Sequence, residues 1–378
     1  MPLALLFLIL GTALVFFFLI GYPILLAVFP FRTKPPVLKD LRYTPTVTAI
    51  VAVYNGAAFM RAKLDTILAL DYPRELLEII VVSDGSTDET DSLVREYADR
   101  GVQLICAPHR GKAAAVNLGI EHATGETLFF TDVRQPLDPM ALRHLVANFA
   151  DPSVGAVTGE MRLLRPEDGE QADMDLYWRY EVWARKQHSR IDSVFNATGC
   201  IYAIRRKLAT PIPPDSLTDD AVLPMRGFLQ GYRVILDPEA IAFDYPALAG
   251  TEFRRRFRTL AGMWQIFAGF PQLFSSRNRM RFHFLSHKFA RLMLPWSILL
   301  IVGSTMALPP SNLKWRLLDG EIAMAVLALL DFVLPRGFPL KRYTSIARTF
   351  ITMNAASASA IVVLFTKAEK LWTPTRVK

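Results

Sequence analysis

The sequence predicts an α/β fold, with a mostly parallel sheet covered by helices on both faces and transmembrane helices at both ends of the chain. Short apolar runs alternate with helical patterns through the middle of the chain, which is typical of a parallel sheet. The chain has 378 residues, of which 52% are hydrophobic, and its longest apolar stretches lie near the two ends. Apolar stretches of about 20 residues are long enough to cross a bilayer.

The expected strands follow one another in a regular order. The first four cover 47–53, 78–83, 103–107 and 126–131, with helical patterns at 56–70, 87–100, 111–123 and 137–149. The later elements are less regular, with strands at 154–162, 200–204 and 233–236 and helices at 171–192 and 219–230. In open parallel sheets ligands bind beyond the carboxyl ends of the strands, so we expect a site at these corners.

Residues 1–31 are predicted to form an N-terminal transmembrane anchor. Residues 3–29 carry no charge, and a spanning helix needs about 20 apolar residues. A cleaved signal peptide is the alternative, but the run is too long, has no basic start and is not followed by a small-residue cleavage site. Basic residues follow at Arg32 and Lys34. The positive-inside rule then places the next domain, residues 45–250, in the cytosol.

Two or three further transmembrane helices are expected within residues 288–367. The apolar stretches are roughly 290–309, 319–335 and 346–366. Glu321 and Asp331 lie in or beside the second stretch, so we expect these carboxylates at a helix end or facing other helices. The basic residues between the last two stretches suit a cytosolic turn. Three spans would nevertheless leave the basic C-terminal tail outside, so the count stays open.

The segment 251–287 is basic and amphipathic. Between Arg254 and Arg291 there are nine Lys or Arg and no acid, which accounts for the net charge of +8. One helical face carries five apolar residues: Phe253, Phe257, Leu260, Trp264 and Phe267. This face either packs against the domain or lies in the plane of a membrane. A phenylalanine-rich basic segment beside a transmembrane run favours membrane lipids as partners over nucleic acid.

Polar residues at the strand ends are candidate ligand contacts. Asp84 ends the second strand and could accept hydrogen bonds from a base or a sugar hydroxyl. The Ser-Thr-Asp sequence that follows belongs to the same corner, and the alternative for these three residues is that they cap the next helix and do nothing else. At the third corner, Gly111 lets the backbone approach a ligand and Lys112 brings positive charge suited to a diphosphate. Asp132 follows the fourth strand, where a carboxylate could hold a divalent cation together with substrate oxygens.

These corners, in this order, resemble the family 2 inverting glycosyltransferases, which have the GT-A (Rossmann-like) nucleotide-sugar fold. The resemblance covers about residues 45–265 and includes VAVYN, SDGSTDET, RGKAAAVNLG, the FFTD corner, NATGCIYAIRR, LTDDAVLPMRGFLQGYRV and RRFRTLAG. With the apolar ends, it implies a bacterial enzyme of the inner (plasma) membrane. The implied donor is a nucleotide sugar, most readily a UDP-sugar, and the implied acceptor is a saccharide or a lipid-linked molecule.

The resemblance also implies roles for single residues. The donor would be bound by Tyr54, Asn55, Asp84, Lys112, Asp132 and Arg134. Asp220, the last acid of Thr218-Asp219-Asp220, would be the general base that takes the proton of the acceptor hydroxyl. Gly199 and Asp219 would lie on the acceptor side. The alternative for the two acids is that they only begin the helix that follows.

The Asp-X-Asp motif of the family is Asp132-Val133-Arg134 in this chain. An arginine has only donors and cannot bind a cation. The protein ligand of a Mg²⁺ or Mn²⁺ ion would then be Asp132, with Asp138 as a weaker candidate. Alternatively Arg134 neutralises the diphosphate itself, or the site is inactive. We therefore expect weaker or altered metal dependence.

Other functions are less well supported. Processive synthases of the family carry a Gln-X-X-Arg-Trp motif, and the nearest stretch here, Phe253–Phe257, has neither Gln nor Trp. This favours single transfer to a lipid-linked or membrane-near acceptor over polymer synthesis. A catalytically impaired nucleotide-sugar-binding subunit is supported by Arg134 and opposed by Asp220. A soluble nucleotidyltransferase is opposed by the apolar ends.

Overall fold

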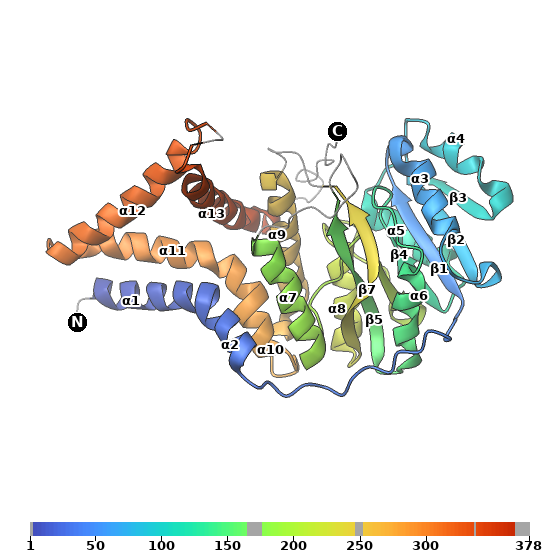
Figure 1. Cartoon of the computed structure of the whole chain (residues 1–378), viewed down its shortest axis with the longest axis horizontal. Helices are drawn as coiled ribbons and strands as arrows, with labels where there is room; N and C mark the ends of the chain where they lie inside the picture. The colour runs from blue at the N-terminus through green and yellow to red at the C-terminus, as the bar shows by residue number, and fades with distance from the viewer. Residues whose placement is uncertain (1–2, 165–175, 246–251, 336–337, 367–378) are drawn as a thin grey trace.

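A seven-stranded sheet forms the centre of the domain in the computed structural model (Figure 1), which describes residues 3–164, 176–245, 252–335 and 338–366. The strand order is β3-β2-β1-β4-β6-β5-β7. The first four strands, β1 (Val47–Val53), β2 (Leu77–Asp84), β3 (Val102–Ala107) and β4 (Thr127–Phe130), are parallel to one another. The predicted mostly parallel sheet is therefore confirmed.

The second half of the sheet contains its antiparallel strand. β6 (Tyr202–Arg205) runs antiparallel to β4 and to β5 (Val154–Leu163), and β7 (Arg233–Asp244) pairs parallel with β5. The sequence predicted β7 only as far as residue 236. The strand continues to Asp244 because its register shifts opposite Thr158–Glu160, after which pairing resumes. This extension carries Asp244 to the same end of the sheet as the candidate site.

Helices cover both faces of the sheet. Neighbouring residues of β1 point to opposite faces, so Ile50 belongs to one buried cluster and Val51 to the other. The helices that flank the parallel strands are α3 (Ala57–Leu68), α4 (Thr90–Arg95), α5 (Lys112–His122) and α6 (Ala141–Ala147). Core residues of α3 and α6 share one cluster, while those of α5 and α8 (Asp219–Leu229) share the other.

Two long helices connect the domain with the helical part of the molecule. They are α7 (Leu176–Ile191), whose predicted first residues 171–175 lie outside the described range, and α9 (Glu252–Gly269). Leu260 and Phe267 of α9 are only 8% and 6% exposed and belong to the core cluster of α8. The part of the apolar face of α9 that contains Leu260 and Phe267 therefore packs inside the protein, as in the first of the two arrangements considered for residues 251–287, whereas Phe253 at the start of the helix is 40% exposed.

Within the described residues, three helices are long and apolar enough to cross a membrane: Leu3–Val28, Arg281–Ala307 and Lys341–Leu364. The first contains α1 (Leu3–Phe16) and α2 (Tyr22–Val28), the second α10 (Arg281–His283) and α11 (Ala290–Ala307), and the third α13 (Lys341–Ser359). α1 lies alongside α11 in a narrow part that projects from the domain (Figure 1). α12 (Asn312–Leu330) turns back between α11 and α13.

The two carboxylates of the C-terminal part have polar partners on neighbouring helices. The Glu321 carboxylate accepts a hydrogen bond from Thr305 Oγ1 of α11 at 2.9 Å. Asp331 follows α12 and accepts a hydrogen bond from Thr344 Oγ1 of α13 at 2.9 Å. Arg348 approaches the same carboxylate at 2.8 Å. The expectation that these acids lie at a helix end or face other helices is confirmed.

Candidate functional site

Four charged side chains from three elements form the centre of the candidate site. Lys112 is the first residue of α5, Asp132 follows β4, and Asp219 and Asp220 begin α8. Lys112 Nζ lies 2.8 Å from Asp132 Oδ1 and 3.2 Å from Asp219 Oδ1. Tyr202 of β6 donates its hydroxyl to Asp219 Oδ2 at 3.3 Å. The predicted donor and acceptor residues therefore meet at one edge of the sheet.

Asp220 has the environment of a proton acceptor. Desolvation and the neighbouring charge of Asp219 raise the pKa of Asp220 to about 7, against the attraction of Lys112. A carboxylate with a pKa near the working pH can take and hold a proton, as a general base must. Gly199 lies against this carboxylate, since a Cβ at position 199 would be 3.2 Å from Asp220 Oδ2. A side chain at position 199 would therefore crowd this carboxylate.

The lysine at the centre keeps Asp132 charged. Desolvation raises the pKa of Asp132, but the attraction of Lys112 and of the more distant Lys63 and Arg258 outweighs it, so the pKa lies below its ordinary value. Burial lowers the pKa of Lys112, yet Asp132 and Asp219 raise it above its ordinary value. Lys112 is thus a permanent cation among three acids, and the pair Lys112–Asp132 is about one-third exposed.

The donor-binding corner predicted from the first two strands is held together by side chains. Asp84 is buried, and its carboxylate accepts hydrogen bonds from the backbone N–H groups of Arg110 at 2.8 Å and Gly111 at 2.9 Å. It therefore shapes the loop before α5 and does not face outward. The ring of Tyr54 stacks on that of His109, with centroids 4.2 Å apart.

Asn55 links the first two corners. Its backbone has a positive φ of 51°, which asparagine adopts more readily than most residues. Its Oδ1 accepts the backbone N–H of Thr87 at 2.7 Å, and its own N–H donates to Ser86 Oγ at 3.1 Å. The Ser-Thr sequence after Asp84 thus orders the corner around Asn55, in addition to preceding a helix.

Arg134 pairs with a residue of the opposite half of the sheet. Its Nη2 lies 2.5 Å from Asp244 Oδ2, and Gln135 Nε2 donates to the same oxygen at 2.9 Å. Lys112, and not Arg134, is the cation that contacts Asp132. The ion pair with Asp244 uses Nη2 of Arg134 and leaves its Nε without a hydrogen-bond partner among the described residues, so a role of Arg134 at a bound diphosphate stays a prediction.

The described residues do not fit a metal ion held by the protein alone. No group of three His, Cys, Asp or Glu close enough to hold a metal occurs among them. Asp132 already contacts Lys112, and Asp138 accepts the backbone N–H of Met140 at 2.9 Å just before α6. A cation at this corner would have Asp132 as its protein ligand and would depend on substrate oxygens for the remainder.

Two cations near the site were not predicted. Lys63 of α3 is only 1% exposed, and its Nζ donates to Thr131 Oγ1 at 2.6 Å and to the carbonyl of Gln135 at 2.5 Å. Burial lowers the pKa of Lys63 to about 7. In the sequence, the feature that could have indicated this residue is the position of a lysine on the apolar helix face that contains Met60 and Ile67. It supports the corner that carries Asp132.

The second cation, Arg258, comes from α9. Its charge acts on both Asp132 and Asp220. α9 lies close to the start of α8 because Gly262 has no side chain, and a Cβ there would be 2.5 Å from Thr218 Cγ2. Gln265 fixes the same contact by accepting the backbone N–H of Leu217 at 3.0 Å. Nothing in the run of arginines distinguished Arg258 in the sequence.

Comparison with known proteins shows which family the domain is similar to. Residues 48–210 match the family model described as Glycosyl transferase family 2. This part of the chain, which includes the first four strands of the sheet, is therefore similar to family 2 glycosyltransferase domains. Over 96% of its length it is similar to the solved structure of the mannosyltransferase PcManGT from Pyrobaculum calidifontis in complex with GDP-Man and Mn²⁺. That likeness covers 99% of the mannosyltransferase, with 27% identity and a TM-score of 0.73.

Curated relatives of the family 2 domain include two bacterial proteins. The poly-beta-1,6-N-acetyl-D-glucosamine synthase of Staphylococcus aureus (strain COL) is 25% identical over 244 residues, which are 62% of this chain and 58% of that protein. The probable glycosyltransferase YdaM of Bacillus subtilis (strain 168) is 25% identical over 272 residues, covering 67% and 63%. The matches thus span less than two thirds of these relatives. Together the comparisons show a GT-A-like fold and a similarity to glycosyltransferases.

Proposed function

We propose that this protein moves a sugar, most readily a hexose, from a nucleotide-diphosphate sugar to an acceptor hydroxyl at the membrane surface, by inverting single displacement. The observation that carries the proposal is Asp220, a carboxylate with a pKa raised to about 7 that lies against Gly199 and beside the Lys112 group. A bare carboxylate at this position is what an acceptor hydroxyl needs in order to lose its proton.

In the proposed reaction, each residue of the site has a separate role. The acceptor oxygen attacks the anomeric carbon from the side opposite the diphosphate, the bond from that carbon to the diphosphate oxygen breaks, and the acceptor proton passes to the carboxylate of Asp220. Negative charge grows on the leaving diphosphate, where fixed cations stabilise it. Lys112 and Arg258 are two of the cations whose charge acts on Asp132. Asp219 keeps Lys112 in place from the acceptor side, at 3.2 Å.

The donor corner would receive the nucleotide. Tyr54 and Asn55 would face the base and ribose, while Asp84 shapes the loop that carries Lys112. A UDP-sugar is the first donor to test on the sequence resemblance. GDP-mannose is the second, because the similar mannosyltransferase holds it. That structure also contains Mn²⁺, so the proposal includes a divalent cation. Among the described residues, Asp132 is the protein ligand that we propose for it.

The helices suggest where the acceptor is met. We place the domain on the cytosolic face of a bacterial inner membrane, with Leu3–Val28, Arg281–Ala307 and Lys341–Leu364 as its spans. A lipid-linked or membrane-near saccharide would then be the acceptor, in the synthesis of a cell-surface polysaccharide or glycolipid. Polymer synthesis is the second candidate, because a curated relative is named as a poly-N-acetylglucosamine synthase.

The decisive experiment measures nucleoside diphosphate released by the full chain in detergent. Wild type is tested with a panel of UDP- and GDP-sugars, in parallel with Asp220→Asn and Asp215→Asn. Asp215 is an exposed acid of the loop before α8 and serves as the matched control. We expect release to fall by about 10²–10⁴-fold in Asp220→Asn alone. Donor binding without turnover, unchanged by Asp220→Asn, would instead indicate a nucleotide-sugar-binding subunit. Product length separates single transfer from polymerisation.

A further inference from the structure

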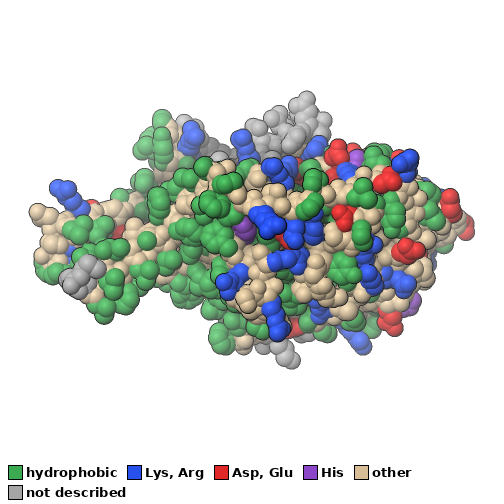
Figure 2. Space-filling view, turned by 90° about the horizontal axis from the view of Figure 1, so that it is seen from below, with side chains coloured by type: hydrophobic (Ala, Val, Ile, Leu, Met, Phe, Trp, Pro, Cys, Tyr) green, Lys and Arg blue, Asp and Glu red, His purple; other side chains and the backbone are tan. Residues whose placement is uncertain are grey.

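Five exposed cations lie where the helical part of the molecule joins the domain. We call them the basic collar: Arg32, Lys34, Arg190, Arg277 and Arg281. Figure 2 shows Lys and Arg side chains gathered on this face of the molecule, where the narrow, largely apolar part meets the broad domain. The five residues come from three segments that are far apart in the sequence: the linker after α2, the end of α7 and the stretch that leads into α10.

Specific contacts bring these three segments together. The backbone N–H of Lys34 donates to the carbonyl of Ile191, the last residue of α7, at 3.0 Å. The ring of Phe31 lies edge-on to that of His283 in α10, with centroids 4.6 Å apart. Tyr22 of α2 also joins the other two segments, since its hydroxyl lies 2.6 Å from His188 Nε2 and 3.1 Å from His283 Nδ1. The collar is therefore a fixed surface of the folded chain.

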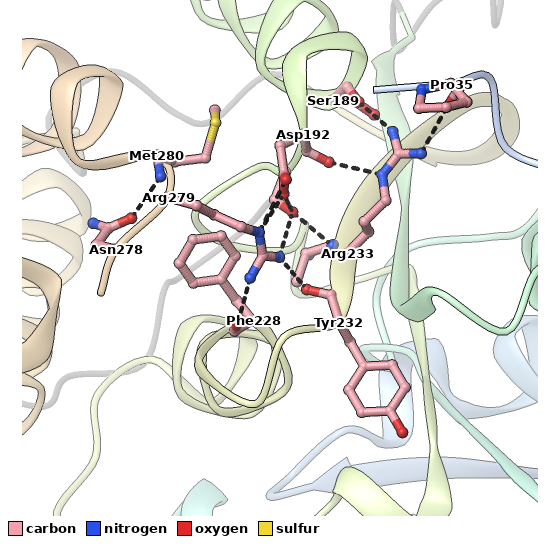
Figure 3. Close-up of polar contacts among 11 residues, drawn as sticks. Pro35, Ser189, Asp192, Phe228, Tyr232, Arg233, Asn278, Arg279 and Met280 are labelled. Carbon is pink, nitrogen blue, oxygen red and sulfur yellow. Dashed lines mark hydrogen bonds and ion pairs between the residues drawn. The ribbon is translucent and has the colours of Figure 1, made fainter. Parts of the chain in front are cut away.

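A partly buried ion pair holds the collar to the domain (Figure 3). Arg279 Nε lies 2.9 Å from both carboxylate oxygens of Asp192, and Arg279 Nη1 donates to the carbonyl of Phe228 at 2.8 Å. Arg233 donates to the carbonyls of Pro35 at 2.9 Å and Ser189 at 3.2 Å. The linker, the end of α7 and the stretch before α10 are thus tied to α8 and β7.

The collar is not neutralised by acids of its own. Asp192, the acid at this junction, uses both oxygens on Arg279 and a further contact on Ser193. None of the five collar side chains has an ion pair with a residue that the structure describes. The sequence has no Asp or Glu in 22–39 or in 271–291. The surface therefore presents five uncompensated positive charges.

The collar also lies level with the ends of two candidate spans. The span Leu3–Val28 ends four residues before Arg32, and the span Arg281–Ala307 begins with a collar residue. Two exposed aromatic side chains accompany the cations, Phe29 at 54% and Phe282 at 44% exposure. Aromatic rings beside Lys and Arg at the end of an apolar helix are typical of the headgroup region of a bilayer.

We propose that the basic collar binds the phosphate-bearing headgroups of anionic phospholipids. Lys and Arg at a membrane surface attract such lipids, and the attraction decays within a Debye length of about 8–10 Å, so the level of the collar matters. The proposal rests on the membrane location given under Proposed function and is independent of the sugar-transfer chemistry.

Headgroup binding has a consequence for the site. Arg279, between two collar residues in the sequence, holds the carbonyl of Phe228 near the end of α8. The same helix begins with Asp219 and Asp220. Lipids that fix the collar therefore fix the helix that carries the proposed base, and they orient the site relative to the bilayer.

The test measures lipid binding to the purified full chain by native mass spectrometry in detergent. Phosphatidylglycerol and phosphatidylcholine with the same acyl chains are added to wild type and to the triple variant Lys34→Gln/Arg277→Gln/Arg281→Gln. The control, Arg61→Gln/Arg95→Gln/Arg100→Gln, removes three exposed cations from α3, α4 and the turn after α4, at the far end of the domain (Figure 1).

We expect wild type and the control to bind phosphatidylglycerol at least tenfold more tightly than phosphatidylcholine, and the collar variant to lose most of that preference. Equal binding of the two lipids by wild type, or equal losses in both triple variants, would overturn the proposal. Wild type alone offers a second test if the collar variant misfolds, since raising the salt concentration should weaken its preference. A protein that prefers phosphatidylglycerol but releases no nucleotide would refute the proposed function and leave this inference standing.

Discussion

Two groups of charged side chains, both centred on one cation, differ in how completely they are satisfied. In the junction group, Arg279 contacts both oxygens of Asp192, two backbone carbonyls and the ring of Phe228, 4.1 Å from its centroid. In the site group, Lys112 faces Asp132 and Asp219, with the charge of Asp220 also acting on it. In the first group one cation pairs with one carboxylate. In the second, one lysine lies among three carboxylates, while Arg258 and Lys63 act on them from farther away.

We interpret the first group as structural and the second as the proposed reactive group. The carboxylate of Asp192 is only 6% exposed, and Arg279 contacts both of its oxygens. Lys112 and Asp132 are 37% and 36% exposed, and Asp220 can be protonated near neutral pH. Carboxylates that crowd around one lysine at a partly open edge repel one another until a ligand, a proton or a cation compensates their charge. Four substitutions or treatments test this contrast.

The largest effect is expected for Lys112→Met. Removing the cation leaves three carboxylates together and takes positive charge away from the leaving diphosphate. Donor turnover should fall by about 10²–10³-fold, the usual loss for one fixed donor of positive charge. Release of nucleoside diphosphate measures it, and Lys207→Met, at an exposed lysine after β6, is the control. Turnover within a few fold of wild type would contradict the assignment of Lys112 to the site.

A smaller and different effect is expected for Arg279→Met. It leaves Asp192 as an unpaired buried charge, which is costly. The midpoint of thermal unfolding should fall by about 5–10 °C. The double variant Arg279→Met/Asp192→Leu should recover part of this loss, because no lone charge remains. If Arg279→Met abolished turnover in protein that unfolds at the wild-type temperature, the division between structural and reactive groups would be wrong.

The third effect is a shift in pH dependence. Because the base must be unprotonated, kcat/KM should rise with pH and level off above about 7, the pKa of Asp220. The negative charge of Asp219 favours the protonated form of Asp220, so Asp219→Asn should move this rise to lower pH, by about one unit. Residual activity of Lys112→Met should move the opposite way. A rise at the same pH in all three proteins would exclude Asp220 as the titrating group.

The smallest effect is expected from metal removal. With Asp132 as the single protein ligand and Lys112 already beside it, chelation should lower turnover by less than about tenfold. Arg134→Asp restores the second acid of the motif and should increase the response to Mn²⁺. Complete loss of wild-type activity with chelator, and full recovery with Mn²⁺, would show that the lysine does not substitute for a metal.

The sequence was sufficient for the features that depend on local pattern. The strand at 47–53 was predicted with its exact bounds, and the corners at Asp84, Lys112 and Asp132 follow their strands as expected. Parallel strands present their carboxyl ends at one edge, so the order of corners already implied a shared site.

Features that depend on distant pairing could not be predicted. Arg134 is bound by Asp244, which is 110 residues away on a strand whose length was underestimated. The oxygens of Asp84 bind the loop before α5, a contact that the sequence did not reveal, and its contact with a donor stays a prediction. The apolar face of α9 has the same period whether it meets lipid or protein, so only the packing of Leu260 and Phe267 could decide.

The junction group also fixes the position of the domain relative to the collar. Arg279 and Arg233 connect the collar to α8 and β7. Gly262 allows α9 to pack closely against Thr218 at the start of α8. With the helices in a bilayer, the reacting carboxylate would stand at a constant height above the lipid surface. Acceptors would then be sorted by geometry as well as by chemistry, since a hydroxyl carried too near to the bilayer or too far from it would miss the carboxylate.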